Sequence, residues 1–379
     1  MKIAYIPTSD PYNKHSWSGT DYYTRLSLEN QGNVVYCIYG FKPSRTLLTW
    51  IKMIAAKLVG AHYYDYRNKQ AARQWARYIK ANLQEGTDAI LSLGTTQVAC
   101  LNTEIPLFIM VDGIFEQMRT FYDWGKLSKS CLRDSNEVEQ MALDRSTHVV
   151  SCSKETGEAI KNFYKIPPDK LSIIPLGANF DNWPTMGEVR TFVERRDSEV
   201  CHLLFVGVDW KRKGADIVLE TTKILHDKGF PVVLHLCGLK QIPVRLPSYV
   251  INHGFLRKSD PKENELLLTL YKTSHFLFVP SVAEAYGLVF CEASAYGLPS
   301  ISHRLGGLTT IVEDGKNGQL FDLGTEPKVF ADYIEKIFSD KKAYSTLAMS
   351  SFERFETYLN WDSVGEMYMM LFNKIIKEK

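Results

Sequence analysis

The chain of 379 residues has seven cysteines but no Cys-x-x-Cys pair, and its nine histidines show neither His-x-x-x-His nor His-Glu-x-x-His spacing. Zinc sites are usually built on such closely spaced ligands, so the sequence offers no recognisable ligand set and we expect no metal. The cysteines are dispersed, odd in number and mostly set among apolar residues. We therefore expect buried, reduced thiols rather than disulfides.

Two further features are missing, a membrane-spanning apolar run and a leader sequence. No uninterrupted apolar run reaches membrane-spanning length, and residues 1–6 enter an apolar strand without the three regions of a signal peptide. The formal net charge of +2 gives no reason to expect a nucleic-acid partner. We expect a cytoplasmic protein, with a peripheral position at the inner face of the plasma membrane as the alternative.

Positive charge is concentrated between residues 42 and 80, where nine Lys or Arg residues stand against one acid, Asp65. Within this stretch the apolar residues of 47–59 recur at helical spacing, with Lys52 and Lys57 between them. One interpretation is a surface helix that packs its apolar side on the core. The other is a helix that binds an anionic membrane surface or a phosphorylated acceptor. The sequence leaves both open.

The first half of the chain alternates apolar runs with helix-length segments. Strands are predicted at residues 3–7, 34–38, 89–93, 107–111, 148–152 and 171–175. The first is followed by a polar loop containing Gly19 and then by a helical pattern. Continuous apolar runs of this kind indicate a parallel sheet covered by helices on both faces.

The same pattern begins again after an irregular, charged stretch near residues 180–200. Further strands are predicted at residues 203–207, 232–236, 249–251, 276–279 and 300–302, and the chain ends in an amphipathic helix. A chain of this length exceeds the usual size of one hydrophobic core. We therefore predict two Rossmann-like α/β domains, 1–180 and 181–358, followed by a helix over 359–379.

The segment 280–299 contains the residues most typical of a binding site. A strand ends at Val279, and a helix is predicted to begin near Gly287 and to stop at Gly297. Ligands of parallel α/β sheets bind where a strand crosses into a helix, because the free N–H groups and the dipole of the helix attract phosphate. Gly287 has no side chain that would block this approach.

Glu284 and Glu292 lie on either side of this predicted helix start. Glutamates near a helix N-terminus often serve only the helix dipole, which is the simpler interpretation. Glu292, however, stands among apolar residues, so its carboxylate would face an interior or a cleft and would need a partner. A ligand rich in hydroxyl groups would be such a partner.

Two glutamates separated by seven residues, followed by Gly297-Leu298-Pro299 and Gly306-Gly307-Leu308, resemble the signature of the retaining family-4 glycosyltransferases. Phe205-Val206-Gly207 with Lys213-Gly214 is similar to that family's strand and phosphate loop. The resemblance implies the GT-B fold, in which two Rossmann-like domains face each other across a cleft. The N-terminal domain would bind the acceptor, the C-terminal domain would bind the nucleotide sugar, and the final helix would cross back.

The resemblance also implies roles for single residues. Glu292 would bind the ribose hydroxyls, and Glu284 would contact the transferred sugar. The amides around Gly287, Leu288 and Val289 would hold the diphosphate or the sugar. Lys213 would neutralise the departing diphosphate, a task that Mg²⁺ performs in other enzymes.

Other positions follow the family less closely. Gly207 would lie in the phosphate loop, Gly19 would approach the donor from the N-terminal domain, and the turn containing Leu256 would lie near the base. The family often has Arg where this chain has Val208, so Arg212 is expected to supply the second positive charge. It often has His where this chain has Asp112, which would contact the sugar or the acceptor, or would simply cap a turn.

The function implied is a metal-independent, retaining transfer of a hexose-type sugar from a UDP- or GDP-sugar to a saccharide or lipid-linked acceptor, in cell-surface polysaccharide or glycolipid synthesis. No cofactor is expected besides this co-substrate. Front-face attack and double displacement both remain open. The alternatives are a nucleotide-sugar epimerase and a non-catalytic scaffold that binds nucleotide sugars. The loop after the first strand has no Gly-x-Gly-x-x-Gly motif, which argues against a dehydrogenase.

Overall fold

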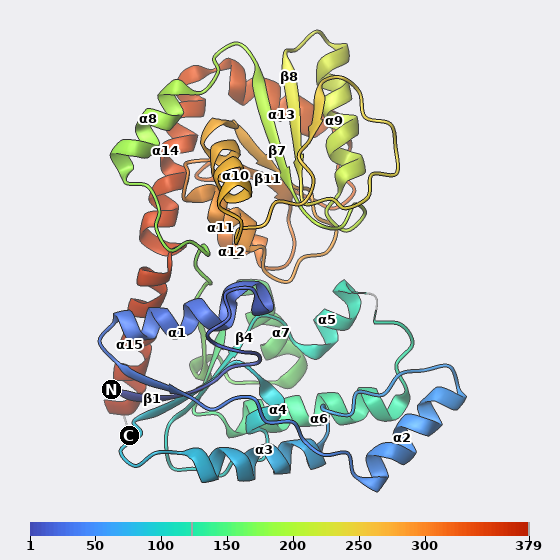
Figure 1. Cartoon of the computed structure of the whole chain (residues 1–379), viewed down its shortest axis with the longest axis vertical. Coiled ribbons are helices and arrows are strands. Elements are labelled where there is room, and N and C mark those ends of the chain that lie inside the picture. Colours follow the sequence, from blue (N-terminus) through green and yellow to red (C-terminus); the bar gives the residue numbers. More distant parts are fainter. Residues whose placement is uncertain (123, 378–379) are drawn as a thin grey trace. The chain divides into compact units, whose positions relative to one another are not determined.

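A computed structural model describes residues 1–122 and 124–377 (Figure 1). The chain divides into two compact units: Met1–Leu176 together with the chain from Trp361 onward, and Gly177–Asn360. Each unit is built on a six-stranded sheet with helices around it. The prediction of two Rossmann-like α/β domains with parallel sheets is confirmed.

The sheet of the first unit has the strand order β2-β1-β3-β4-β5-β6, and every pair of neighbours is parallel. Its strands are β1 (Lys2–Ile6), β2 (Val34–Cys37), β3 (Ala89–Ser92), β4 (Leu107–Val111), β5 (His148–Ser151) and β6 (Leu171–Ile173). All six coincide with predicted strands. Strands β3, β4 and β5 are buried along their whole length, as expected for apolar runs covered on both faces.

Helices cover both faces of this sheet. They are α1 (Thr20–Asn30), α2 (Leu47–Leu58), α3 (Lys69–Asn82), α4 (Thr95–Val98), α5 (Phe115–Phe121), α6 (Lys129–Arg145), α7 (Lys154–Tyr164) and α15 (Trp361–Lys377), with short 3₁₀ turns η1 (Ser16–Gly19) and η2 (Pro168–Lys170). The final helix α15 packs on α1, where the rings of Trp361 and Tyr23 stack with centroids 6.1 Å apart. Figure 1 shows α1 and α15 on one face of the sheet, and α3, α4 and α6 on the other.

The sheet of the second unit has the order β12-β11-β10-β7-β8-β9 and is also parallel throughout. Its strands are β7 (Cys201–Val206), β8 (Val232–Cys237), β9 (Val250–Asn252), β10 (Phe276–Phe278), β11 (Ser300–His303) and β12 (Gly318–Phe321). Five coincide with predicted strands, and β12 was not predicted. It is short and begins with Gly318 and Gln319, so the sequence shows no apolar run there.

The helices of the second unit are α8 (Met186–Arg195), α9 (Ala215–Asp227), α10 (Pro261–Thr273), α11 (Leu288–Ser294), α12 (Leu308–Ile311), α13 (Pro327–Ser339) and α14 (Lys341–Tyr358). Among the described residues, no helix is both long and apolar enough to span a bilayer. All seven cysteines are free, and five of them are buried.

Each sheet reverses its strand order once. In the second unit the chain builds outward from β7 through β8 to β9, and then returns to place β10, β11 and β12 on the other side of β7. The neighbours β7 and β10 therefore lead away in opposite directions. The equivalent pair in the first unit is β1 and β3. A crevice opens beyond the carboxyl ends of such a pair, and ligands of parallel sheets bind there.

Candidate functional site

The predicted site residues of the second unit gather at the carboxyl ends of β7 and β10. Lys213 lies in the loop between β7 and α9, and Glu284 lies in the loop between β10 and α11. The Lys213 ammonium forms an ion pair with the Glu284 carboxylate. Residues 71 positions apart in the sequence thus meet at the point where the strand order reverses.

Glycines allow the loops around this ion pair to pack closely. A Cβ at Gly214 (φ +74°) would lie 2.2 Å from the carbonyl oxygen of Pro280, and one at Gly306 (φ +52°) would lie 1.8 Å from that of Glu284. A Cβ at Gly207, at the end of β7, would lie 2.8 Å from Cγ of Lys213. Larger residues would push these loops apart, so the glycines allow Lys213 and Glu284 to come within ion-pair distance.

The carboxylate of Glu284 has three polar neighbours and is almost fully buried, with 8% of its side chain exposed. Besides the Lys213 ammonium, it accepts a hydrogen bond from the Ser281 hydroxyl at 3.3 Å. The Arg212 guanidinium lies 3.9 Å from its other oxygen. A buried carboxylate is tolerated only with such partners, and the two cations make this position strongly attractive to a phosphate group as well.

Helix α11 begins next to Glu284, as predicted. Gly287 caps its N-terminus with φ +103°, in the left-handed region that favours glycine, and Leu288 is its first residue. A Cβ at Gly287 would lie 3.4 Å from Cγ of Glu284 and 2.8 Å from Cδ2 of Leu308. The first turn, with Val289, therefore presents its backbone N–H groups close to the ion pair.

Glu292 lies in the second turn of α11, and the protein itself supplies partners for its carboxylate. It forms an ion pair with Lys258 and accepts a hydrogen bond from the Tyr271 hydroxyl at 3.2 Å. Burial and this carboxylate together raise the pKa of Tyr271 well above its ordinary value. The sequence interpretation considered only a ligand as the partner of Glu292 and did not identify Lys258 or Tyr271.

Lys258 was missed although its neighbours were singled out. The turn with Leu256 connects β9 to α10, and Gly254 at its start has φ +67°. The carbonyl of Gly254 accepts a hydrogen bond of 2.7 Å from the N–H of Gly238, just after β8. The turn is thereby held at the carboxyl end of the sheet, from where Lys258 reaches Glu292. A lysine directly after a predicted binding turn was the signal available in the sequence.

The remaining two predicted residues belong to the first unit. Gly19 (φ +84°) caps the N-terminus of α1 after Trp17 and Ser18, which also have positive φ values. Asp112 directly follows β4, and burial raises the pKa of its carboxyl group to about 6. A carboxyl group with such a pKa can exchange a proton near neutral pH. Contacts of Gly19 and Asp112 with a donor or acceptor stay predictions.

Metal ligands were also sought among the described residues. Within residues 1–122 and 124–377, no group of three or more His, Cys, Asp or Glu side chains is arranged so that it could hold a metal ion. The expectation that the protein works without a metal stays a prediction.

Sequence comparison places the second unit among known proteins. Residues 191–353 match the family model described as "Glycosyl transferases group 1". The chain is 26% identical over 251 residues to the D-inositol 3-phosphate glycosyltransferase of Corynebacterium glutamicum, covering 63% of this chain and 60% of that protein. It is 28% identical over 243 residues to the protein of that name from Corynebacterium diphtheriae, covering 60% and 56%. The chain thus spans about 60% of the first of these relatives.

Solved structures are similar over the whole chain. The sucrose-phosphate synthase of Thermosynechococcus elongatus has a TM-score of 0.67 at 17% identity and covers 100% of both chains. HepE of Anabaena, solved in complex with UDP, has a TM-score of 0.65 at 16% identity, covering 99% of this chain and 100% of that chain. At this level of identity the likeness shows the fold, which is that of GT-B glycosyltransferases.

Proposed function

Because residues 191–353 match the family model of the group 1 glycosyl transferases, we propose that this protein moves a hexose-type sugar from a UDP- or GDP-sugar to a saccharide or lipid-linked acceptor. The observation that carries the proposal is the Lys213–Glu284 ion pair beside the start of α11. It lies inside the matched segment and at the reversal point of the sheet, where a nucleotide would bind.

The proposed reaction breaks the bond between the anomeric carbon and the phosphate oxygen of the donor. Both electrons of that bond leave with the nucleoside diphosphate. The oxygen of an acceptor hydroxyl forms the new bond to the anomeric carbon, and its proton leaves with the diphosphate. Negative charge therefore grows on the diphosphate. Lys213, Arg212 and the first N–H groups of α11 would stabilise this charge more in the transition state than in the bound donor, which lowers the barrier.

The two glutamates would take the sugar hydroxyls. Glu284 would contact the transferred sugar while Lys213 turns toward the diphosphate, and Glu292 would bind the ribose. Each carboxylate already has a lysine partner, so a donor would exchange one charged hydrogen bond for others without leaving a carboxylate unpaired. The donor would thus bind in a site that is largely preformed.

Retention of the anomeric configuration and independence of metal belong to this proposal, as do the cytoplasmic location and the role in polysaccharide or glycolipid synthesis. Retention is tested by the anomeric configuration of the product, read by NMR. Metal independence is tested by activity in EDTA. If EDTA abolishes turnover and Mg²⁺ or Mn²⁺ restores it, Lys213 does not carry the neutralising charge alone.

The first experiment is a thermal-shift screen with UDP, GDP, ADP and their sugars, with and without EDTA. A nucleotide at about 100 times its dissociation constant should add about 2.7 kcal/mol to the free energy of unfolding. The variant Glu292→Ala should weaken the shift. The matched control is Glu265→Ala, which removes an exposed glutamate from α10.

The possible results separate the candidate functions. A selective shift that EDTA leaves unchanged and Glu292→Ala reduces would support the donor site and identify the base. Donor turnover without an acceptor product would favour an epimerase or a hydrolase. If no nucleotide changes the unfolding temperature, the proposal fails and a scaffold protein becomes the better description.

A further inference from the structure

Helix α2 presents its apolar side outward. Leu47, Ile51, Ile54 and Leu58 are 77%, 54%, 57% and 82% exposed. Their spacing of four, three and four residues places them in one row along the helix. Figure 1 shows α2 at the outer edge of the first unit. We call these four residues, with the adjacent Trp50, the outer stripe.

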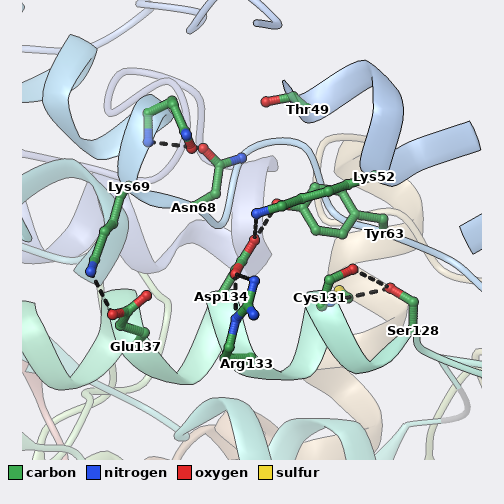
Figure 2. Close-up of polar contacts among 12 residues, drawn as sticks. Thr49, Lys52, Tyr63, Asn68, Lys69, Ser128, Cys131, Arg133, Asp134 and Glu137 are labelled. Atoms are coloured by element: carbon green, nitrogen blue, oxygen red, sulfur yellow. Dashed lines mark hydrogen bonds and ion pairs between the residues drawn. The ribbon is translucent and has the colours of Figure 1, made fainter. Parts of the chain in front are cut away.

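The opposite side of α2 is held on the unit by an ion pair, by small residues and by Met53, which packs on a small apolar cluster around Ala56 and Cys131. Lys52 forms an ion pair with Asp134 of α6, and the same carboxylate accepts a hydrogen bond of 2.6 Å from the Tyr63 hydroxyl. Figure 2 shows Lys52 and Tyr63 converging on Asp134. Thr49 and Ala56 are buried on this side. The orientation of the helix is therefore set by an ion pair and by close packing.

This arrangement argues against the core-packed interpretation of α2, whereas binding to an anionic surface stays a prediction. A core-packed helix would bury its aliphatic row and expose its lysines. Here the row is exposed, and Lys52, with only 18% of its side chain exposed, is engaged by Asp134. Single exposed apolar residues are common, whereas a continuous row over three helical turns is a surface on which a partner can bind.

Positive side chains surround the outer stripe. Lys57 lies on α2 itself and is exposed. The Arg45 guanidinium lies 5.0 Å from the centre of the Trp50 ring and forms an ion pair with Asp65. The Lys126 ammonium donates to the carbonyl of Val59, at the end of the helix. Arg133, with 68% of its side chain exposed, adds a further positive charge beside Lys52 on Asp134, on the opposite side of α2. The partner should therefore combine an apolar layer with negative charge.

We propose that the outer stripe docks this protein on an anionic lipid surface. A helix of twelve residues is about 18 Å long and about 10 Å wide, so its outer side covers roughly 200 Å². A stable protein interface needs about 800 Å² on each partner. The roughly 200 Å² of the outer side is too small for such an interface. It is sufficient for a helix that lies in the plane of a membrane interface, where aliphatic side chains enter the acyl layer and cations meet the headgroups.

Trp50 fits this position as well, because its ring is 46% exposed at the side of the stripe. Tryptophan prefers the boundary between headgroups and acyl chains.

The docking proposal stands on the geometry of the first unit alone and does not depend on the transferase reaction. Lipid binding and nucleotide binding can therefore succeed or fail separately.

The test is co-sedimentation of the full chain with vesicles of phosphatidylcholine alone or mixed with phosphatidylglycerol. We expect binding to the anionic vesicles at low salt and much less to the neutral ones. The double variant Ile51→Glu/Ile54→Glu should bind about tenfold more weakly or worse. The matched control Phe163→Glu, which changes a 49% exposed residue on α7 of the same unit, should bind like the wild type.

The charge requirement is tested on Lys57 and Lys126, because Lys52 is needed to hold the helix. Lys57→Gln and Lys126→Gln should each weaken binding to anionic vesicles about fivefold, an effect that falls as salt is added. The control Lys211→Gln removes an exposed lysine of the second unit and should change nothing. Circular dichroism checks that every variant is folded.

A second measurement locates the contact. Brominated lipid should quench tryptophan fluorescence of the wild type, and Trp50→Phe should lose most of that quenching while still binding. The proposal is overturned if the wild type does not sediment with anionic vesicles at low salt, or if Ile51→Glu/Ile54→Glu binds as well as the wild type. A wild-type dimer in sedimentation velocity that this double variant dissociates would assign the stripe to a second copy of the chain instead.

Discussion

The two units have the same plan, six parallel strands with one reversal of order, but they use the reversal point differently. In the first unit the loop after β1 is tied to Asp21, which is fully buried. Its carboxylate accepts hydrogen bonds from the N–H groups of Thr8 and Ser9 at 3.1 and 2.8 Å, and from their two hydroxyls. In the second unit the same place holds the Lys213–Glu284 ion pair.

The two units differ in whether a ligand could replace the hydrogen-bond partners of the buried carboxylates. The donors to Asp21 are backbone and short side-chain groups of one loop, so its carboxylate is satisfied locally and serves to hold that loop. Lys213 and Lys258 reach Glu284 and Glu292 through long, rotatable side chains. Their ammonium groups can move toward a phosphate while sugar hydroxyls take their place on the carboxylates. One topology thus carries a structural carboxylate in the first unit and an exchangeable pair in the second.

The largest expected effect comes from breaking the close packing at the second reversal point. Gly306→Ala places a Cβ 1.8 Å from the carbonyl oxygen of Glu284, so the free energy of unfolding should fall by about 4 kcal/mol or more. The matched control is Gly315→Ala, with a similar φ of +73° and open space around it. It should cost only about 1 kcal/mol of backbone strain. Urea unfolding of both variants measures the difference, and equal losses would contradict the packing described.

The next effect concerns catalysis. Neutralising both partners in Lys213→Met/Glu284→Gln avoids a lone buried charge, so the variant should fold. Loss of the lysine should still reduce release of nucleoside diphosphate from the donor about a hundred- to a thousandfold. Lys211→Ala, two residues away and exposed, serves as the control. Full turnover in the double variant would show that the ion pair belongs to the fold and not to the reaction.

The units should also differ in their response to acid. Four histidines of the second unit form a ladder across neighbouring strands. Nδ1 of His202 lies 3.0 Å from Nε2 of His235, and Nδ1 of His235 lies 3.0 Å from Nε2 of His253. The backbone N–H of His202 donates a hydrogen bond to Nδ1 of His275. Burial lowers the pKa of His235 to about 4 and that of His275 to about 3. His235 and His275 are therefore neutral at pH 7.

Histidines whose pKa is lowered in the folded protein take up protons more readily in the unfolded chain, where the pKa of histidine is about 6.5. Their contribution to stability is present above that pH and is lost as the pH falls. We expect the second unit to lose about 3 kcal/mol between pH 7 and pH 4. In the first unit His148 acts in the same direction, with a pKa lowered to about 4, whereas Asp112, raised to about 6, gains stability as the pH falls.

Hydrogen exchange followed separately in residues 1–176 and 177–360 measures this difference. The second unit should lose protection at a higher pH than the first, and His235→Gln with His275→Gln should flatten its pH dependence. If the first unit opens first, or if the double variant keeps the same slope, the histidine ladder is not the cause.

The smallest effect is expected at Lys258. Its side chain is 36% exposed, so the pair with Glu292 contributes at most about 1 kcal/mol. If a ribose displaces it, Lys258→Ala should tighten the binding of UDP or GDP by no more than about fivefold, measured by calorimetry. Binding that becomes tenfold weaker would show that Lys258 itself contacts the nucleotide.

The fold could be predicted from the sequence because continuous apolar runs mark the positions of buried strands in a parallel sheet. Eleven strands were predicted from such runs, and the twelfth, β12, was missed because it starts with a glycine and a glutamine. The start of α11 was predicted from Gly287, since glycine is favoured where φ is positive. These signals are local, so a single sequence contains them.

The site could be predicted only in part. Glu284 and Glu292 were predicted to act together in a binding site, but their lysine partners are 71 and 34 residues away along the chain. Lys213 was predicted to contact a diphosphate, and nothing in the sequence indicates that it pairs with Glu284. Nor does the order of residues show that His202, His235, His253 and His275 would form one ladder across neighbouring strands.

By itself, the sequence determined the two α/β units, eleven of their strands and the glycine at the start of α11, because burial of apolar runs and backbone freedom are properties of short segments. The tertiary structure decided which charges meet and which sides face outward. For α2 the helical period was readable, but the side that faces outward was not, because Asp134 of α6, which pairs with Lys52, is distant in the sequence. Ion pairs and exposed faces depend on distant residues, which only the folded chain brings together.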